Sequence, residues 1–135
     1  MLKKAHISTL LVSTTENGED TIRTQADGLC QVEEDAVLLR YPETDNDGIA
    51  ILLITESLAD LKRRGHTRSR LTFIEGRLQP CPYSTPQGDL DISIFTHSHT
   101  LSLNASGGCF QARYALLAAG RHVADNVLTV EFAFE

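Results

Sequence analysis

The chain has 135 residues, of which 41% are hydrophobic and 22% charged, and its formal net charge is −6. At about 100 to 200 residues per domain, this length predicts one domain over residues 1–135 and argues against a two-domain enzyme. The composition is close to the globular average, which argues against disordered, collagen-like and coiled-coil chains.

No segment predicts membrane insertion or export. The longest uncharged apolar run, residues 49–55, is far shorter than the roughly 20 residues that a membrane-spanning helix needs. Residues 1–4 begin like a signal peptide, but His6, Ser8 and Thr9 interrupt the segment before an apolar region develops. We therefore expect a cytoplasmic protein.

The number and spacing of the cysteines fit the cytoplasm, which is a reducing compartment. Their number, three, is odd and no two form a C-x-x-C pair, which argues against a disulfide framework. We expect Cys30, Cys81 and Cys109 to be free thiols that pack as small hydrophobic side chains, with Cys81 the most exposed. A redox or metal cluster of the three is the alternative.

Charge is distributed unevenly along the chain. Residues 16–60 hold twelve acidic residues and two arginines, whereas residues 62–77 hold six basic residues and one glutamate. The acidic total disfavours non-specific binding to nucleic acid or to an anionic membrane. The basic stretch 62–77 predicts either a local anion site or cross-strand pairs with neighbouring acidic strands.

Short runs of alternating polar and apolar residues, separated by turn residues, predict antiparallel strands. Asn17-Gly18 indicates a tight hairpin, and Gly28, inside strand-like sequence, indicates a bulge or a corner. Residues 57–65 fit either a two-turn helix or a strand over 58–63, and the surrounding meander favours the strand. The other expected strands lie within residues 6–14, 21–32, 36–41, 49–55, 67–73, 90–103, 110–117 and 128–134.

The residue pattern gives three further local predictions. Alternation after Thr67 places Leu71 and Phe73 inside and Arg68 and Arg70 in water. Three prolines fall within residues 78–88, which predicts a connection and not a central strand. The inward-facing set changes parity near residues 95–96, which predicts a bulge or a turn.

Eight to ten strands with a turn every 8 to 12 residues fit a sandwich or a barrel. We predict an all-β fold: a single antiparallel up-and-down β-barrel of 8–10 strands, because closure removes exposed sheet edges.

The middle of the chain also resembles a known family. The spacing Arg63-x-Gly65, then Phe73-x-x-Gly76, then Tyr83-x-Thr85-Pro86-x-Gly88-x-Leu90 and Thr96 is similar to the signature of the YwiB-like family of small bacterial proteins. This resemblance implies a calycin-like (lipocalin-like) barrel and, because the family is a domain of unknown function, no catalytic role. Cys81 and the His97-Ser98-His99 segment depart from the family pattern.

Four residues are candidates for ligand binding. His97 and His99 alternate in a strand, so their rings are expected on one face, where they could bind a metal; two ligands alone make no site, and a solvent-facing or core pair is the alternative. Arg63 offers a planar fork of donors for a carboxylate or phosphate, and Tyr83 adds a ring with a hydroxyl. The structural alternative has Tyr83 closing a barrel end against Phe73, with Arg63 bonding loop carbonyls.

We therefore expect a protein that binds a small amphipathic or anionic ligand in the barrel without converting it, with its anionic head near Arg63. No catalytic motif, phosphate loop, metal or cofactor site is evident. One alternative is a protein-interaction module with a solid barrel that uses residues 62–77. Another is a hydrolase or lyase with His97 or His99 as base. We expect a monomer or homodimer, with a small-molecule ligand or a protein partner and without nucleic acid.

Overall fold

The computed structural model describes all of residues 1–135 and consists of ten strands joined by short turns. Neighbouring strands are antiparallel and follow chain order around a closed barrel, in which β1 also pairs with β10. This confirms the predicted all-β, up-and-down barrel and is consistent with a calycin-like fold. The elements are β1 (Leu2–Thr15), β2 (Gly18–Val32), β3 (Ala36–Glu43), a 3-10 turn η1 (Thr44–Asn46), β4 (Gly48–Thr55), β5 (Ala59–Arg64), β6 (Arg68–Phe73), β7 (Leu78–Thr85), β8 (Gly88–Asn104), β9 (Gly107–Ala118) and β10 (Arg121–Phe134).

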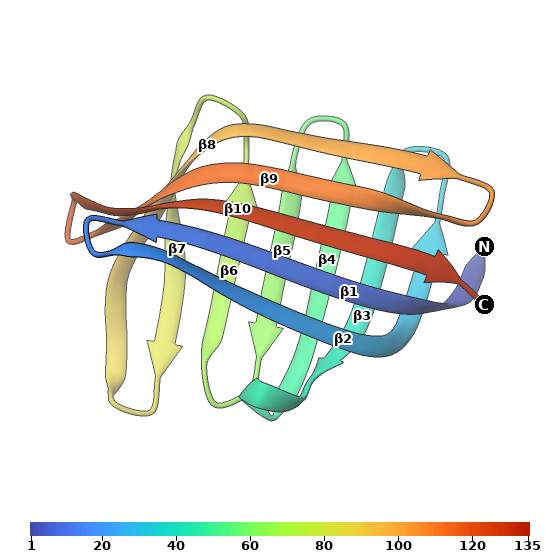
Figure 1. The fold of residues 1–135 in the computed structure, drawn as a ribbon, viewed down its shortest axis with the longest axis horizontal. Helices are drawn as coiled ribbons and strands as arrows, with labels where there is room; N and C mark the ends of the chain where they lie inside the picture. The colour runs from blue at the N-terminus through green and yellow to red at the C-terminus, as the bar shows by residue number, and fades with distance from the viewer.

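The barrel is flattened into two layers that cross at a steep angle (Figure 1). The long strands β1, β2, β8, β9 and β10 form one layer, and the shorter strands β3 to β7 form the other. Two strands connect the layers. β2 pairs with β1 along its length but with β3 only through residues 29–32, and β8 pairs with β7 only through residues 88–95.

Gly28 lies where β2 leaves the first layer to pair with β3. A Cβ there would lie 2.4 Å from the backbone oxygen of Arg40, so the close approach of the two strands requires glycine. This confirms that the glycine marks a corner. The Asn17-Gly18 hairpin and the strand over residues 58–63, rather than a helix, are also confirmed.

The prediction for residues 78–88 was wrong, because Leu78–Thr85 forms β7. Pro80 and Pro82 are accommodated since β7 pairs with β6 through only two residue pairs, at Tyr83 and Ser84. Most of that side of β7 therefore resembles a sheet edge, where a missing N–H costs no ladder hydrogen bond.

Aromatic rings fill the centre of the barrel. Phe73 and Phe110 are fully buried, and Phe73 packs edge-on against Tyr114 with ring centroids 5.1 Å apart. They belong to a cluster of 21 buried residues. Arg68 and Arg70 are exposed, as predicted. The cysteines are free, but Cys109 rather than Cys81 is the more exposed.

The structure contains no helix with the length and apolar character needed to span a bilayer.

We expect Phe73→Ala to lower the free energy of unfolding by about 3 to 5 kcal/mol, because it removes buried surface and leaves a cavity. Urea denaturation followed by circular dichroism measures the change. Leu78→Ala is the matched control, because Leu78 is 56% exposed and its loss should cost little. Equal losses in the two variants would contradict a core centred on Phe73.

Candidate functional site: a basic cavity beside β6 and β7

A cavity of about 580 Å³ opens in the wall formed by β5, β6, β7 and the start of β8. It contains Arg63 and Tyr83, two of the four residues singled out from the sequence. The structure therefore brings these two together. The remaining lining residues are Lys62, Arg64, Arg68, Ser69, Arg70, Pro82, Ser84, Asp89 and Leu90.

Strand pairing explains why the cavity lies here. Arg63 pairs with Ser69 across β5 and β6, and Ser69 pairs with Tyr83 across β6 and β7. Paired residues point to the same face, so these three side chains form an inward-facing row. The cavity therefore lies where β6 and β7 are joined, since Arg68–Ser84 and Ser69–Tyr83 are their only residue pairs and all four residues line it.

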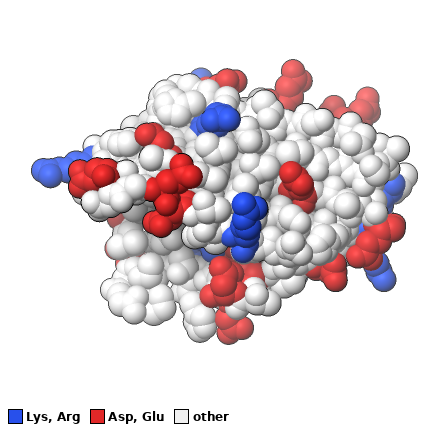
Figure 2. Space-filling model, viewed as in Figure 1, with Lys and Arg blue, Asp and Glu red and all other residues white.

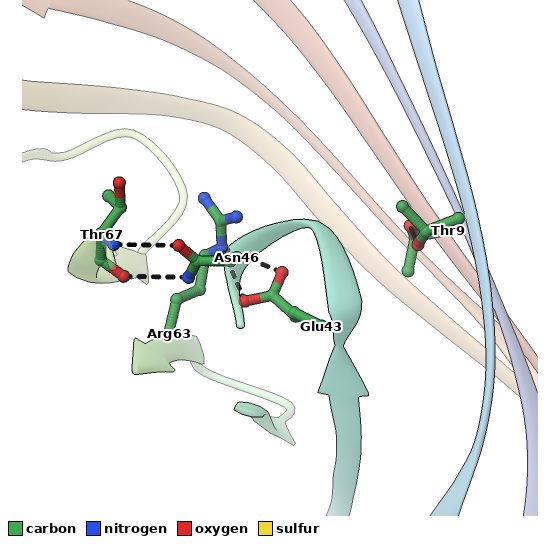
Figure 3. Close-up of polar contacts among 6 residues, drawn as sticks. Thr9, Glu43, Asn46, Arg63 and Thr67 are labelled. Atoms are coloured by element: carbon green, nitrogen blue, oxygen red, sulfur yellow. Dashed lines mark hydrogen bonds and ion pairs between the residues drawn. The ribbon is translucent and has the colours of Figure 1, made fainter. Parts of the chain in front are cut away.

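An ion pair orients Arg63. Its Nε donates hydrogen bonds to both carboxylate oxygens of Glu43, at 3.1 and 3.0 Å (Figure 3). Burial lowers the pKa of Arg63, but the hydrogen bond and charge of Glu43 outweigh it and leave the pKa above its ordinary value. The two Nη atoms point away from Glu43 and form no hydrogen bond within the protein. The donor pair suited to an oxyanion is therefore unused.

Asn46, in η1, fixes the end of β5 next to this pair. Its side chain donates to the carbonyl oxygen of Thr67 and accepts from the Thr67 N–H, both at 2.9 Å (Figure 3). A Cβ at Gly65 would lie 2.1 Å from the Asn46 carbonyl oxygen. Gly65 in the family-like motif thus has a structural role, which is to let the β5–β6 turn contact η1.

The other basic side chains differ in their partners. Arg70 donates from Nε to Asp60 on the neighbouring strand β5 at 3.0 Å, whereas the partner of Arg63, Glu43, lies on β3, two strands away. Lys62, Arg64 and Arg68 have no acidic partner within 4.0 Å. The idea that acidic strands neutralise the basic stretch is therefore correct for only part of it. The cavity keeps a local positive charge on a chain whose net charge is −6.

Buried polar groups without hydrogen-bond partners lie in the cavity wall and around Tyr114. Ser69 is 6% exposed and its Oγ has no hydrogen-bond partner. Thr96 and Asn126 flank Tyr114 on the two neighbouring strands, and each also has a buried, unpartnered oxygen. Apart from Thr96, which belongs to the family-like motif, the sequence analysis missed these residues. The available signal was a polar residue at a position where the strand alternation expects an apolar one, as at Asn126 between Ala124 and Leu128.

The prediction that the rings of His97 and His99 lie on one face was wrong. β8 bulges between Thr96 and Ser98, so His97 is the extra residue; its ring is exposed and lies 5.3 Å from that of Phe95. His99 pairs with the buried Ala112 and therefore faces inward, at a different cavity. The two rings do not share a face. The bulge itself confirms the predicted change of parity.

Comparisons with known proteins bear on the fold and the family. A family model described as Domain of unknown function (DUF1934) matches residues 6–130. The crystal structure of the ywiB protein from Bacillus subtilis superimposes with a TM-score of 0.88 at 18% identity, covering 99% of this chain and 93% of that one. These findings confirm the resemblance to the YwiB-like family. A search of curated proteins found no significant match.

Burial raises the pKa of Tyr114 above its ordinary value, so the neutral phenol is favoured in the folded state. The unfolded chain, whose tyrosines ionise near pH 10, then releases protons that the folded protein retains. We expect stability to fall as the pH rises from about 10, and Tyr114→Phe to make that fall shallower by up to about 1.4 kcal/mol per pH unit. Urea denaturation from pH 9 to 11 measures both slopes, and identical slopes would contradict a buried neutral Tyr114.

Proposed function

We propose that this chain, which belongs to the family described as Domain of unknown function (DUF1934), binds a small anionic ligand whose charged group occupies the basic cavity. The main support is the unused Nη edge of Arg63, held in place by Glu43. The protein acts as a binder and leaves the ligand chemically unchanged.

The charged group is best matched by a phosphate or carboxylate. The planar guanidinium presents two parallel N–H donors that fit two oxygens of such a group. Glu43 compensates part of the Arg63 charge, so the unpaired Lys62, Arg64 and Arg68 supply the remaining attraction. Because the chain is acidic overall, its summed field disfavours a long polyanion such as nucleic acid while this local site favours a small anion.

An apolar portion of the ligand has a place as well. Tyr83, Pro82 and Leu90 line one side of the cavity, and Leu90 is 50% exposed. The ligand is therefore amphipathic. It enters from the flank of the barrel and not through its centre, where the rings of Phe73, Phe110 and Tyr114 are packed.

The alternative functions have less support. A histidine-dependent hydrolase or lyase needs a group that works with the base, and neither His97 nor His99 forms a hydrogen bond to a carboxylate or hydroxyl. A protein-interaction module using residues 62–77 remains the second candidate, because Arg64 and Arg68 are exposed and unpaired. A cytoplasmic location remains part of the proposal, supported by the three free cysteines.

We expect the Kd of octyl phosphate for the unchanged protein to be at least about 10-fold lower than its Kd for the Arg64→Glu, Arg68→Glu double variant. This corresponds to a difference of about 1.4 kcal/mol in binding free energy. Both side chains are exposed and lack ion pairs, so the variant should fold normally. Arg63→Lys should also weaken binding, because lysine keeps the charge and loses the bidentate fork. Isothermal titration calorimetry provides the affinities.

Two controls make the result specific. Arg121→Glu, in an exposed position at the start of β10, should leave the affinity unchanged, and octyltrimethylammonium should not bind. Absence of octyl phosphate binding at millimolar concentration, or equal affinity in all variants, would reject the proposal. Loss of a captured protein partner in the double variant, without any small-anion binding, would instead favour the interaction module.

A further inference from the structure

The second half of β8 has an open edge. β8 pairs with β7 as far as Phe95 and makes one isolated bridge from Thr96 to Glu75. From Ser98 to Asn104 it pairs with β9 alone. Backbone donors and acceptors on the other side of this stretch therefore face no strand of the protein, which is the condition for pairing with another chain.

This edge lacks the usual protection against such pairing. Residues 96–104 contain no lysine, arginine, aspartate or glutamate, and charged side chains are what commonly protect an exposed edge. The open edge of β2 provides the contrast. Residues 18–27 of β2 pair only with β1, but they carry Glu19, Asp20, Arg23 and Asp27.

An apolar groove of about 1250 Å³ runs beside the β8 edge. Leu101 and Leu103 of β8 face it, and Leu103 is 45% exposed. The opposite side is formed by the β2–β3 and β4–β5 turns, with Val37, Ile54 and Leu58. His99, also in the lining, has a buried Nδ1 without a hydrogen-bond partner.

The rim of the groove is acidic. Its charged lining residues are Glu33, Glu34, Asp35 and Glu56, and no lysine or arginine lines it. Acidic side chains gather along the upper right of the molecule in Figure 2, where Figure 1 places these two turns. Charge complementarity therefore calls for a basic occupant.

We propose that the β8 edge binds an extended segment of a partner protein in which apolar residues alternate with lysine or arginine. The segment adds as a strand to Ser98–Asn104, placing its apolar side chains in the groove and its basic ones against the rim. A second copy of this chain fits less well, because a symmetric contact would place two acidic rims against each other. This site is separate from the basic cavity and does not depend on its ligand.

The test uses an acetylated, amidated ten-residue peptide of alternating valine and lysine, followed by fluorescence anisotropy. We expect it to bind, and the matching valine and glutamate peptide not to bind. Hydrogen exchange should show new protection of backbone amides within residues 98–104. A Val-Lys peptide N-methylated at alternate residues, made in both registers, should lose binding in one register because its paired N–H groups are removed.

Charge variants distinguish binding of the peptide at this site from its general electrostatic attraction to an acidic protein. Glu34→Lys with Glu56→Lys should weaken peptide binding at least about 10-fold, whereas Glu16→Lys with Glu19→Lys, the same charge change at the β1–β2 hairpin, should not. Equal effects of the two pairs, equal binding of both N-methylated registers, or protection elsewhere would overturn the proposal. So would sedimentation of the free protein as a dimer that the rim variant dissociates.

Discussion

The Arg63–Glu43 ion pair shows how a closed barrel can hold a charge at an inward position. Alternation along β5 places Ala59, Leu61 and Arg63 on the inner face. Because an unpaired buried charge is costly, the Arg63 guanidinium needs an acidic partner there. Glu43 supplies it from the end of β3. With side chains 27% and 15% exposed, the pair contributes more to orientation than to stability. The fixed direction of the Arg63 donors follows from this constraint.

The open strand edges follow from the way the barrel closes. β2 and β8 are long strands that pair with the second layer over only part of their length, through residues 29–32 and 88–95. The remainder of each strand keeps an open edge. The basic cavity lies instead where β5, β6 and β7 are paired, at Arg63, Ser69 and Tyr83. Closure by short corner contacts therefore leaves open strand edges without disturbing the core.

Period-two alternation was sufficient to predict the all-β class, the meander and the inward position of Phe73, because these depend on local pattern and burial. It failed at residues 78–88, where proline is tolerated by a partly unpaired neighbour that only the tertiary structure reveals. It also failed for His97, because the change of parity indicated a bulge or a turn near residues 95–96 but not that His97 would be the extra residue. Arg63 and Tyr83 were identified, but Ser69 and Glu43 depend on contacts between distant strands.

The uneven distribution of charge along the sequence becomes a separation of charge in space when the barrel folds. β5 begins beside the acidic β4–β5 turn and ends at Arg63 and Arg64, so the two charged regions lie at opposite ends of one short strand. Separation keeps the acidic rim from neutralising the basic cavity. A chain with net charge −6 can therefore present two local regions of opposite sign, which an even distribution of the same residues would not allow.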